Sequence, residues 1–238
     1  MIYYQKQYHR QQRERSVSSF HSAGSNIGCK EKVKIKNHTK MERKEKDWDK
    51  LLHIDTCGRE DYQEDKVHFP YEPTPYVVLK RLAESGLVNR DDSILDYGCG
   101  KGRVLVFLAR EIGCGGFGIE YDLMLYQQAL DNIAASSIPR ISIMQGNAET
   151  CIVPEDITRC FFFNPFSESI LRRVLDRIQE SYYRKPREIL LFFYYPNEEH
   201  VALLMTRDEL MFSDEIDCSD LFPGNDARER ILVFEVCG

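Results

Sequence analysis

Residues 94–105, which read ILDYGCGKGRVL, decide the fold of this chain. The run from Ile94 to Tyr97 is mostly apolar and has the length of a buried strand. Glycines follow at positions 98, 100 and 102, and apolar residues then recur at helical spacing. Glycines at such a junction let the backbone turn sharply and let a ligand approach it closely. The stretch therefore predicts a strand, a ligand-binding loop and a helix in direct succession.

Short apolar runs and amphipathic runs alternate along most of the remaining chain. Strands are expected at residues 93–97, 116–120, 141–144, 160–163 and 189–195. Two further strands, 210–217 and 230–236, are joined by the turn-forming run FPGN. Thr74, with Pro75 at the first helical position, and Asp122 are expected to cap the helices that follow them. Strand–helix alternation favours a parallel sheet with helices on both faces. We therefore expect an α/β fold with a doubly wound, mostly parallel seven-stranded sheet and an antiparallel C-terminal strand pair.

Composition divides the chain into a basic leader (1–45), a cap or lid segment (46–76) and a main domain (77–238). Residues 1–50 hold 13 of the 32 Lys and Arg residues but only 6 of the 38 Asp and Glu residues. Polar composition without periodicity predicts that the leader is mostly disordered. Its charge suits RNA or an acidic partner. Alternatively, it is a tail that precedes a second start at Met41.

Several classes of protein do not fit this composition. No apolar run approaches the roughly 18 residues that a membrane-spanning helix needs, and no signal-peptide pattern opens the chain. The eight cysteines lack Cys-x-x-Cys spacing, so we expect reduced thiols and no structural metal. A cytoplasmic protein without a membrane segment is the resulting expectation.

Three charged positions indicate what the glycine loop binds. Arg103 stands where a dinucleotide-binding fingerprint needs a further glycine. Asp96, at the end of the first strand, would repel a pyrophosphate but would accept a hydrogen bond from a ligand ammonium group. Glu120 ends the next strand, where its carboxylate is placed to receive two ribose hydroxyls. This set predicts an adenosine that carries a zwitterionic amino acid.

Over residues 71–238 the sequence resembles the class I, or Rossmann-like, S-adenosylmethionine-dependent methyltransferases. The resemblance implies S-adenosyl-L-methionine as cofactor. It places the methionine moiety on Asp96 and the loop, the ribose on Glu120 and the adenine beside Tyr121. Residues 145–148, QGNA, match a segment in which many members have Gly-Asp-Ala, so Asn147 would accept from the adenine amino group. The cofactor-binding residues implied are Asp96, Gly98, Cys99, Gly100, Gly102, Glu120, Tyr121, Asn147, Ala148 and Asn164.

The fourth strand ends in Asn164, Pro165 and Phe166, which we predict to be the catalytic residues. This run is similar to the Asn-Pro-Pro-aromatic motif of amino-group methyltransferases, although one proline is missing. In that motif the asparagine and a proline carbonyl accept hydrogen bonds from a planar amine, and the aromatic ring stacks on it. The alternative is a plain turn in which Asn164 caps a helix and Pro165 starts it. A thinner similarity, to the non-SET histone-lysine methyltransferases, does not select a protein lysine.

The predicted function is methyl transfer to a nitrogen acceptor, which is a nucleic-acid base, a protein side chain or a small amine. Two alternatives stay open: O-methylation of a small metabolite, and a catalytically silent cofactor-binding accessory protein. Tyr71 and Tyr76 are expected to form a lid. Tyr194 and Tyr195 either orient the acceptor or simply pack. No histidine is assigned a catalytic role, and neither the acceptor nor the oligomeric state follows from the sequence.

Overall fold

The computed structural model describes residues 44–58, 71–164, 166–224 and 226–238. The chain divides into two compact units, Met1–Glu42 and Arg43–Gly238, and the second unit holds every described residue. Nearly all of the predicted leader therefore lies outside the described residues. Residues 44–52 form a helix, so the boundary expected between residues 45 and 46 falls inside a helix.

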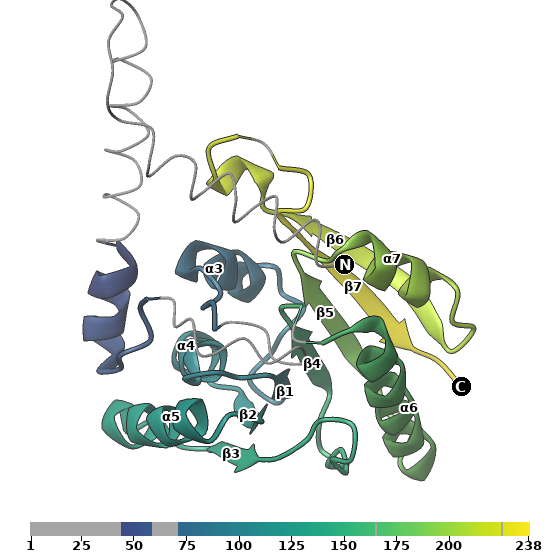
Figure 1. The fold of residues 1–238 in the computed structure, drawn as a ribbon, viewed down its shortest axis with the longest axis horizontal. Coiled ribbons are helices and arrows are strands. Elements are labelled where there is room, and N and C mark those ends of the chain that lie inside the picture. The colour runs from purple at the N-terminus through teal and green to yellow at the C-terminus, as the bar shows by residue number, and fades with distance from the viewer. Residues whose placement is uncertain (1–43, 59–70, 165, 225) are drawn as a thin grey trace, which may run out of the picture. The chain divides into compact units, whose positions relative to one another are not determined.

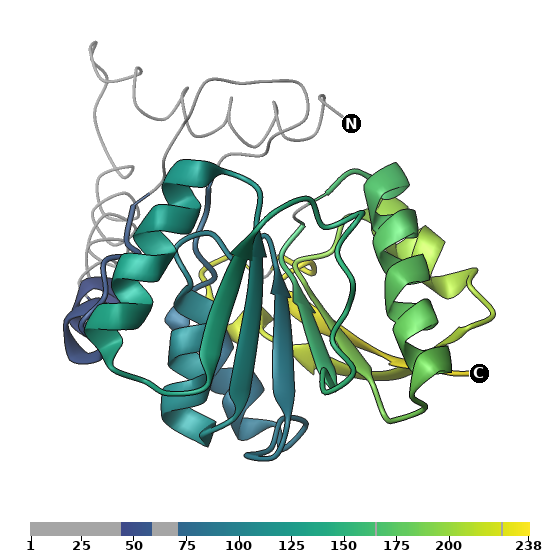
Figure 2. The same cartoon turned by 90° about the horizontal axis from the view of Figure 1, so that it is seen from below.

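A seven-stranded sheet forms the centre of this unit (Figures 1 and 2). Its strands are β1 (Ser93–Tyr97), β2 (Gly115–Glu120), β3 (Ile141–Gln145), β4 (Arg159–Phe162), β5 (Leu190–Tyr194), β6 (Leu210–Asp217) and β7 (Arg230–Val236). They lie in the order β3-β2-β1-β4-β5-β7-β6. The first five are parallel, whereas β7 runs antiparallel to both β5 and β6. The predicted fold class is confirmed.

Helices cover both faces of the sheet, as Figure 2 shows. They are α3 (Tyr76–Glu84), α4 (Arg103–Ile112), α5 (Leu123–Ser136), α6 (Glu168–Arg184) and α7 (Glu198–Met205), with a short 3-10 turn η1 (Ser219–Leu221). The helices α3, α4 and α5 lie on one face, and α6 and α7 lie on the other. None of the helices within the described ranges has the length and apolar character to cross a membrane.

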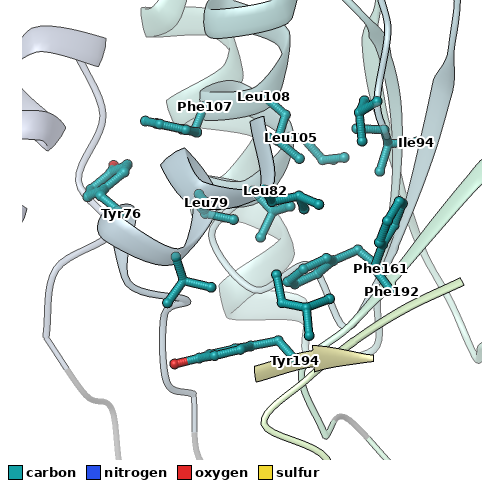
Figure 3. Close-up of a cluster of buried hydrophobic side chains, with 14 of the residues drawn as sticks. Tyr76, Leu79, Leu82, Ile94, Leu105, Phe107, Leu108, Phe161, Phe192 and Tyr194 are labelled. Atoms are coloured by element: carbon teal, nitrogen blue, oxygen red, sulfur yellow. The ribbon is translucent and has the colours of Figure 1, made fainter. Parts of the chain in front are cut away.

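Two apolar cores follow from the alternation of side chains along the strands. Ile94, Phe161 and Phe192 enter the core beneath α3 and α4, which Figure 3 shows in close-up. Leu95 and Phe193 enter the opposite core, beneath α6 and α7. All of these side chains are buried. The strands are apolar on both faces because both faces are covered.

The strand order reverses between β1 and β4, and this reversal locates the ligand edge. The helix after β1 packs on one face, and the helix after β4 packs on the other. In open α/β sheets, ligands bind at the carboxyl ends of the strands beside such a switch point. The loop after β1 and the end of β4 therefore lie together at the edge where the sequence places the cofactor.

Of the two helix caps predicted near this edge, one is confirmed and one is wrong. Asp122 caps α5, since its side chain accepts from the N–H groups of Met124 and Leu125. The cap predicted at Thr74 is wrong, because Pro75 occupies the cap position and α3 begins at Tyr76. Thr74 is buried, and its carbonyl instead accepts a hydrogen bond from Arg103.

Candidate active site

The glycine loop after β1 has the backbone that its sequence predicts. Gly98, Gly100 and Gly102 all have positive φ angles, of 70°, 53° and 83°. These left-handed conformations cost glycine little and other residues more. The N–H groups of Gly98 and Cys99 both donate to the carbonyl of Ile119, near the end of β2. The loop is therefore tied to the neighbouring strand at the ligand edge.

Glu120 joins the end of β2 to the glycine loop. Its Oε2 accepts the N–H of Gly100 at 2.8 Å, and its Oε1 accepts the N–H of Asp122 at 2.9 Å. Burial raises the pKa of Glu120, and these backbone donors partly offset the rise. Each carboxylate oxygen has a second lone pair. Glu120 is thus held rigidly and can still accept hydrogen bonds from ligand hydroxyls.

Asp96 is a buried carboxylate that lacks a complete set of partners. The residue is 3% exposed, and its Oδ2 has no hydrogen-bond partner among the described residues. Burial and the nearby charge of Glu120 raise its pKa to about 8. An unpartnered buried polar atom is costly, and such atoms commonly mark a missing ligand. A ligand ammonium group would supply both a donor and an opposite charge.

Tyr71 lies against the glycine loop. A Cβ placed on Gly100 would come within 2.4 Å of Tyr71 Cε2, so the aromatic ring occupies the space that the missing side chain leaves. The Tyr71 hydroxyl donates to the Thr56 carbonyl at 2.9 Å, and Lys101 Nζ lies 5.1 Å from the ring centroid. This position suits the predicted lid, which stays a prediction.

Tyr76, the other expected lid residue, belongs to the core. It is 1% exposed and packs against Trp48 and Phe107. Its hydroxyl donates to Asp49 Oδ1 inside the protein. Burial, reinforced by this hydrogen bond, raises the pKa of Tyr76 well above its ordinary value. The expectation that Tyr76 forms part of a lid is therefore wrong.

Arg103, the first residue of α4, anchors the N-terminal segment to the glycine loop. Its Nε donates to Thr56 Oγ1 at 2.7 Å, and its Nη1 donates to the Thr74 carbonyl at 3.1 Å. Its guanidinium pairs with Glu45 and lies 4.2 Å from the centroid of the Tyr76 ring. The side chain is 3% exposed. In the sequence, Arg103 served only as evidence against a dinucleotide-binding fingerprint. Its anchoring role was not predicted.

The predicted adenine side lies beyond Glu120. Tyr121 is exposed, and Ala148 is buried. Gln145 pairs with Glu120 across β2 and β3, and its Nε2 donates to the Tyr121 carbonyl at 3.0 Å. Asn147 Oδ1 accepts the N–H of Glu149 at 2.9 Å, so one lone pair of this oxygen is already used. The residues assigned to the adenine therefore share one edge of the sheet.

Asn164, which lies in the loop after β4, is hydrogen-bonded to the loop after β5. Its φ angle is +43°, and its Nδ2 donates to the carbonyl of Tyr195, which follows β5. The helix cap that was the alternative prediction is wrong, because α6 begins at Glu168 with Ser167 in the cap position. Pro165 lies outside the described residues. The catalytic role of Asn164 stays a prediction.

The half-buried Phe166 has a partner that the sequence did not reveal. Its ring lies 6.1 Å from the Tyr97 ring, and its carbonyl lies 3.1 Å from His200 Nε2. His200 is 2% exposed, and burial lowers its pKa, which favours the neutral ring. The two residues are 34 positions apart, so no local pattern could have paired them. His200 supports the loop that holds the predicted catalytic residues.

Tyr194, the last residue of β5, and Tyr195, which follows it, each bind a carboxylate near the start of β7. Tyr194 donates to Glu229 Oε2 at 2.6 Å, and Tyr195 donates to Asp226 Oδ2 at 2.9 Å. Phe163 packs on Tyr194 with ring centroids 4.8 Å apart. Glu229 and Asp226 were not singled out in the sequence, because their contacts cross 35 and 31 positions.

Comparison with known proteins agrees with the fold. No protein-family model matches the chain. A protein-lysine N-methyltransferase from Saccharolobus islandicus is 37% identical over 82 residues, which cover 34% of this chain and 51% of the relative. The chain thus spans about half the length of the curated relative that it matches.

Two solved structures show the same architecture. An RNA methyltransferase from Salinibacter ruber in complex with S-adenosyl-L-homocysteine matches with a TM-score of 0.51 and 20% identity, over 70% of this chain and 94% of its own. The mitomycin 7-O-methyltransferase MmcR matches with a TM-score of 0.53 and 15% identity, over 68% of this chain and 53% of its own. The chain has the Rossmann-like fold that these methyltransferases share. Because one neighbour acts on RNA and another on an oxygen, the fold does not select the acceptor.

Proposed function

We propose that this protein is an S-adenosylmethionine-dependent methyltransferase that acts on a nitrogen acceptor. One observation carries the proposal: the unpartnered Oδ2 of Asp96, buried beside the glycine loop. A buried carboxylate with a spare acceptor fits a ligand that brings an ammonium group. It does not fit a pyrophosphate, because the carboxylate of Glu120 and the ionised form of Asp96 would both repel phosphate charge.

Each residue at this edge would bind a different part of the cofactor. Asp96 would accept from the ammonium group, and Glu120 would accept from the ribose hydroxyls through its remaining lone pairs. Tyr71 would cover the glycine loop and exclude water. When bound, S-adenosylmethionine supplies a methyl group on a sulfonium, and the electron pair of the broken bond stays on sulfur. The protein's task is then to bind and orient the acceptor.

The side-chain orientation of Asn164 supports a nitrogen acceptor. The Tyr195 carbonyl can only accept, so Asn164 must direct its Nδ2 toward it. This leaves Oδ1 as the atom that Asn164 offers elsewhere, and a carbonyl-type oxygen accepts from an amine N–H. The name of the curated relative, a protein-lysine N-methyltransferase, favours the same class of acceptor atom. We further propose that the protein acts in the cytoplasm, where its seven described cysteines, all free, would stay reduced.

A methyl-transfer assay tests this function against its alternatives. The protein would be incubated with methyl-labelled S-adenosylmethionine and, separately, poly-L-lysine, a mixed-sequence RNA and a catechol. We expect labelled methyl groups on nitrogen, and a loss of about a hundredfold in rate for Asn164→Ala. Transfer to the catechol oxygen alone would contradict the nitrogen acceptor. Cofactor binding without transfer to any acceptor would favour the silent accessory protein.

A further inference from the structure

A hydroxyl–carboxylate pair, Tyr194 with Glu229, lies at the ligand edge outside the predicted catalytic run. Tyr194 ends β5, and the antiparallel β7 places Ile231 opposite it. Glu229, just before β7, therefore reaches the same edge, where the Tyr194 hydroxyl donates to its Oε2 at 2.6 Å. Tyr194 is 2% exposed and Glu229 is half-buried. The tyrosine is therefore fixed by its burial, whereas the carboxylate of Glu229 is partly exposed to solvent.

The strand register places this pair close to the glycine loop. Tyr97 pairs with Phe162, and Phe162 pairs with Phe193. The residues that follow, Phe163 and Tyr194, therefore lie one and two strands from the loop, at about 4.8 Å per strand. Figure 3 shows Tyr194 at the margin of the core, with its hydroxyl directed away from the neighbouring phenylalanine rings. The pair thus stands beside the end of β4, where the methyl group would be delivered.

The charge at this place is negative and only partly compensated. Arg228 pairs with Asp226 at 2.8 Å and holds the pKa of that carboxyl well below its usual range. Among the described residues, no lysine or arginine forms an ion pair with Glu229. Burial raises the pKa of Glu229, and the charges of Asp226 and Glu72 raise it further, whereas the Tyr194 hydrogen bond and the charge of Arg228 lower it without cancelling the rise. A cation beside Glu229 would relieve this repulsion.

We propose that Tyr194 and Glu229 form the acceptor subsite and bind a protonated alkyl amine, as at the end of a lysine side chain. This inference rests on the proposed function. Phe163, which is half-buried and packs on Tyr194, would contact the methylene groups of the amine. Tyr194 orients the carboxylate, and the second oxygen of Glu229 accepts from the ammonium group.

The subsite also accounts for the proton that an amine must lose before it can attack. One N–H bond of the ammonium breaks, its electron pair stays on nitrogen as the lone pair, and the proton moves to Glu229. Because Glu229 is half-buried rather than sealed, the proton can pass on to solvent. A carboxylate whose pKa is raised is a better base for this step.

The charges favour a protein lysine over a nucleic acid. Three acidic residues, Glu72, Asp226 and Glu229, lie close enough to interact, and Arg228 is the one basic residue whose charge acts on Glu229. The chain beyond residue 50 holds most of the 38 acidic residues but only 19 of the 32 basic ones. A phosphate backbone would be repelled by such a surface, whereas a basic peptide would be attracted.

Binding in the presence of S-adenosylhomocysteine tests the subsite without relying on turnover. The probe is Nα-acetyl-L-lysine methylamide, measured by calorimetry, with its Nε-acetylated form as the uncharged comparison. We expect the amine to bind and the acetylated form not to bind. Glu229→Gln should weaken amine binding by about tenfold or more, and Tyr194→Phe by a smaller factor. Glu180→Gln, an exposed carboxylate on α6, should leave it unchanged.

The order of measurement separates this inference from the proposed function. S-adenosylhomocysteine binding is measured first, in the wild type and in each variant. Failure of the wild type to bind it would overturn the proposed function and this subsite with it. Normal binding of S-adenosylhomocysteine with no amine binding, or with equal amine binding in Glu229→Gln, would overturn the subsite alone. Methyl transfer to RNA but not to poly-L-lysine would also overturn it.

Discussion

The backbone N–H of Gly100 donates a 2.8 Å hydrogen bond to Oε2 of Glu120. This bond joins the loop after β1 to the end of β2, so the two parts of the candidate cofactor site hold each other in place. Because Glu120 is buried, its carboxylate has little water to replace this donor. The loop is therefore shaped before any ligand arrives.

Removal of this acceptor should loosen the loop. In Glu120→Ala the Gly100 amide loses its partner, so its hydrogen exchange should become faster by about tenfold or more. Exchange measured by NMR would show this, and Glu111→Ala, at the exposed end of α4, serves as the control. Unchanged protection of the Gly100 amide in Glu120→Ala would show that the loop does not depend on the bond.

The raised pKa of Asp96 should couple cofactor binding to proton release. With a pKa of about 8, Asp96 is mostly protonated at pH 7, and a bound ammonium group would favour the ionised form. Binding should therefore release up to one proton and become stronger as pH rises from 6 to 8. Calorimetry in phosphate and in Tris buffers measures the released proton from the difference in heat. Equal heats in both buffers would contradict the assignment.

The same group should also make the stability of the free protein depend on pH. An acid whose pKa rises on folding, here from about 4 to about 8, holds its proton more tightly in the folded state. The free energy of unfolding should then fall as pH rises between these values. Asp96→Asn should remove most of this fall, as urea unfolding at pH 5 and pH 8 would show. If the free energy of unfolding depended on pH in the same way in the variant, the pKa of Asp96 would not be raised by folding.

Arg103 should contribute strongly to stability because its partners stay buried when it is removed. Arg103→Met leaves Glu45 and Asp49 without their cation, and the loss of one partner from a buried pair costs about 3–5 kcal/mol. Urea unfolding measures the change. Arg110→Met, which is exposed on the same helix, should shift stability by less than about 0.5 kcal/mol. Similar effects of the two substitutions would mean that the network adds little.

Tyr71 and Gly100 should be coupled. Gly100→Ala places a methyl group where the Tyr71 ring lies and requires a strained backbone, so cofactor binding should weaken. Tyr71→Ala should also weaken it, through loss of the lid. In the double variant the clash is absent. Its loss of binding free energy should therefore be smaller than the sum of the losses in the two single variants. Strictly additive losses, measured by calorimetry, would show that Tyr71 and Gly100 are not coupled.

Local patterns predicted the fold well because the strands are short apolar runs that end at turn residues. The bounds expected for β1, β6 and β7 match the structure, and the cap at Asp122 follows from contacts within one helical turn. The cap at Thr74 failed because its buried carbonyl accepts from Arg103, a residue far along the chain. Local propensity could not foresee that tertiary contact.

The site was predictable only where its residues carry a local signal. Asp96, the loop glycines and Glu120 sit at strand ends, and the sheet register brings them together. His200 and Glu229 have no such signal, because their roles arise from contacts with Phe166 and Tyr194 across the fold. Tyr76 was misassigned because an aromatic residue in a proline-rich segment suits a lid and a core equally well.

Calorimetric titration of the wild type with S-adenosylmethionine, with Asp96→Ala and Glu120→Ala measured alongside, tests whether these two carboxylates hold the cofactor. We expect micromolar binding, about −8 kcal/mol, that is lost or greatly weakened in both variants. Asp131→Ala, which removes an exposed carboxylate on α5, should bind normally. Absence of binding in the wild type, or equal affinity in all four proteins, would contradict a cofactor site at Asp96 and Glu120.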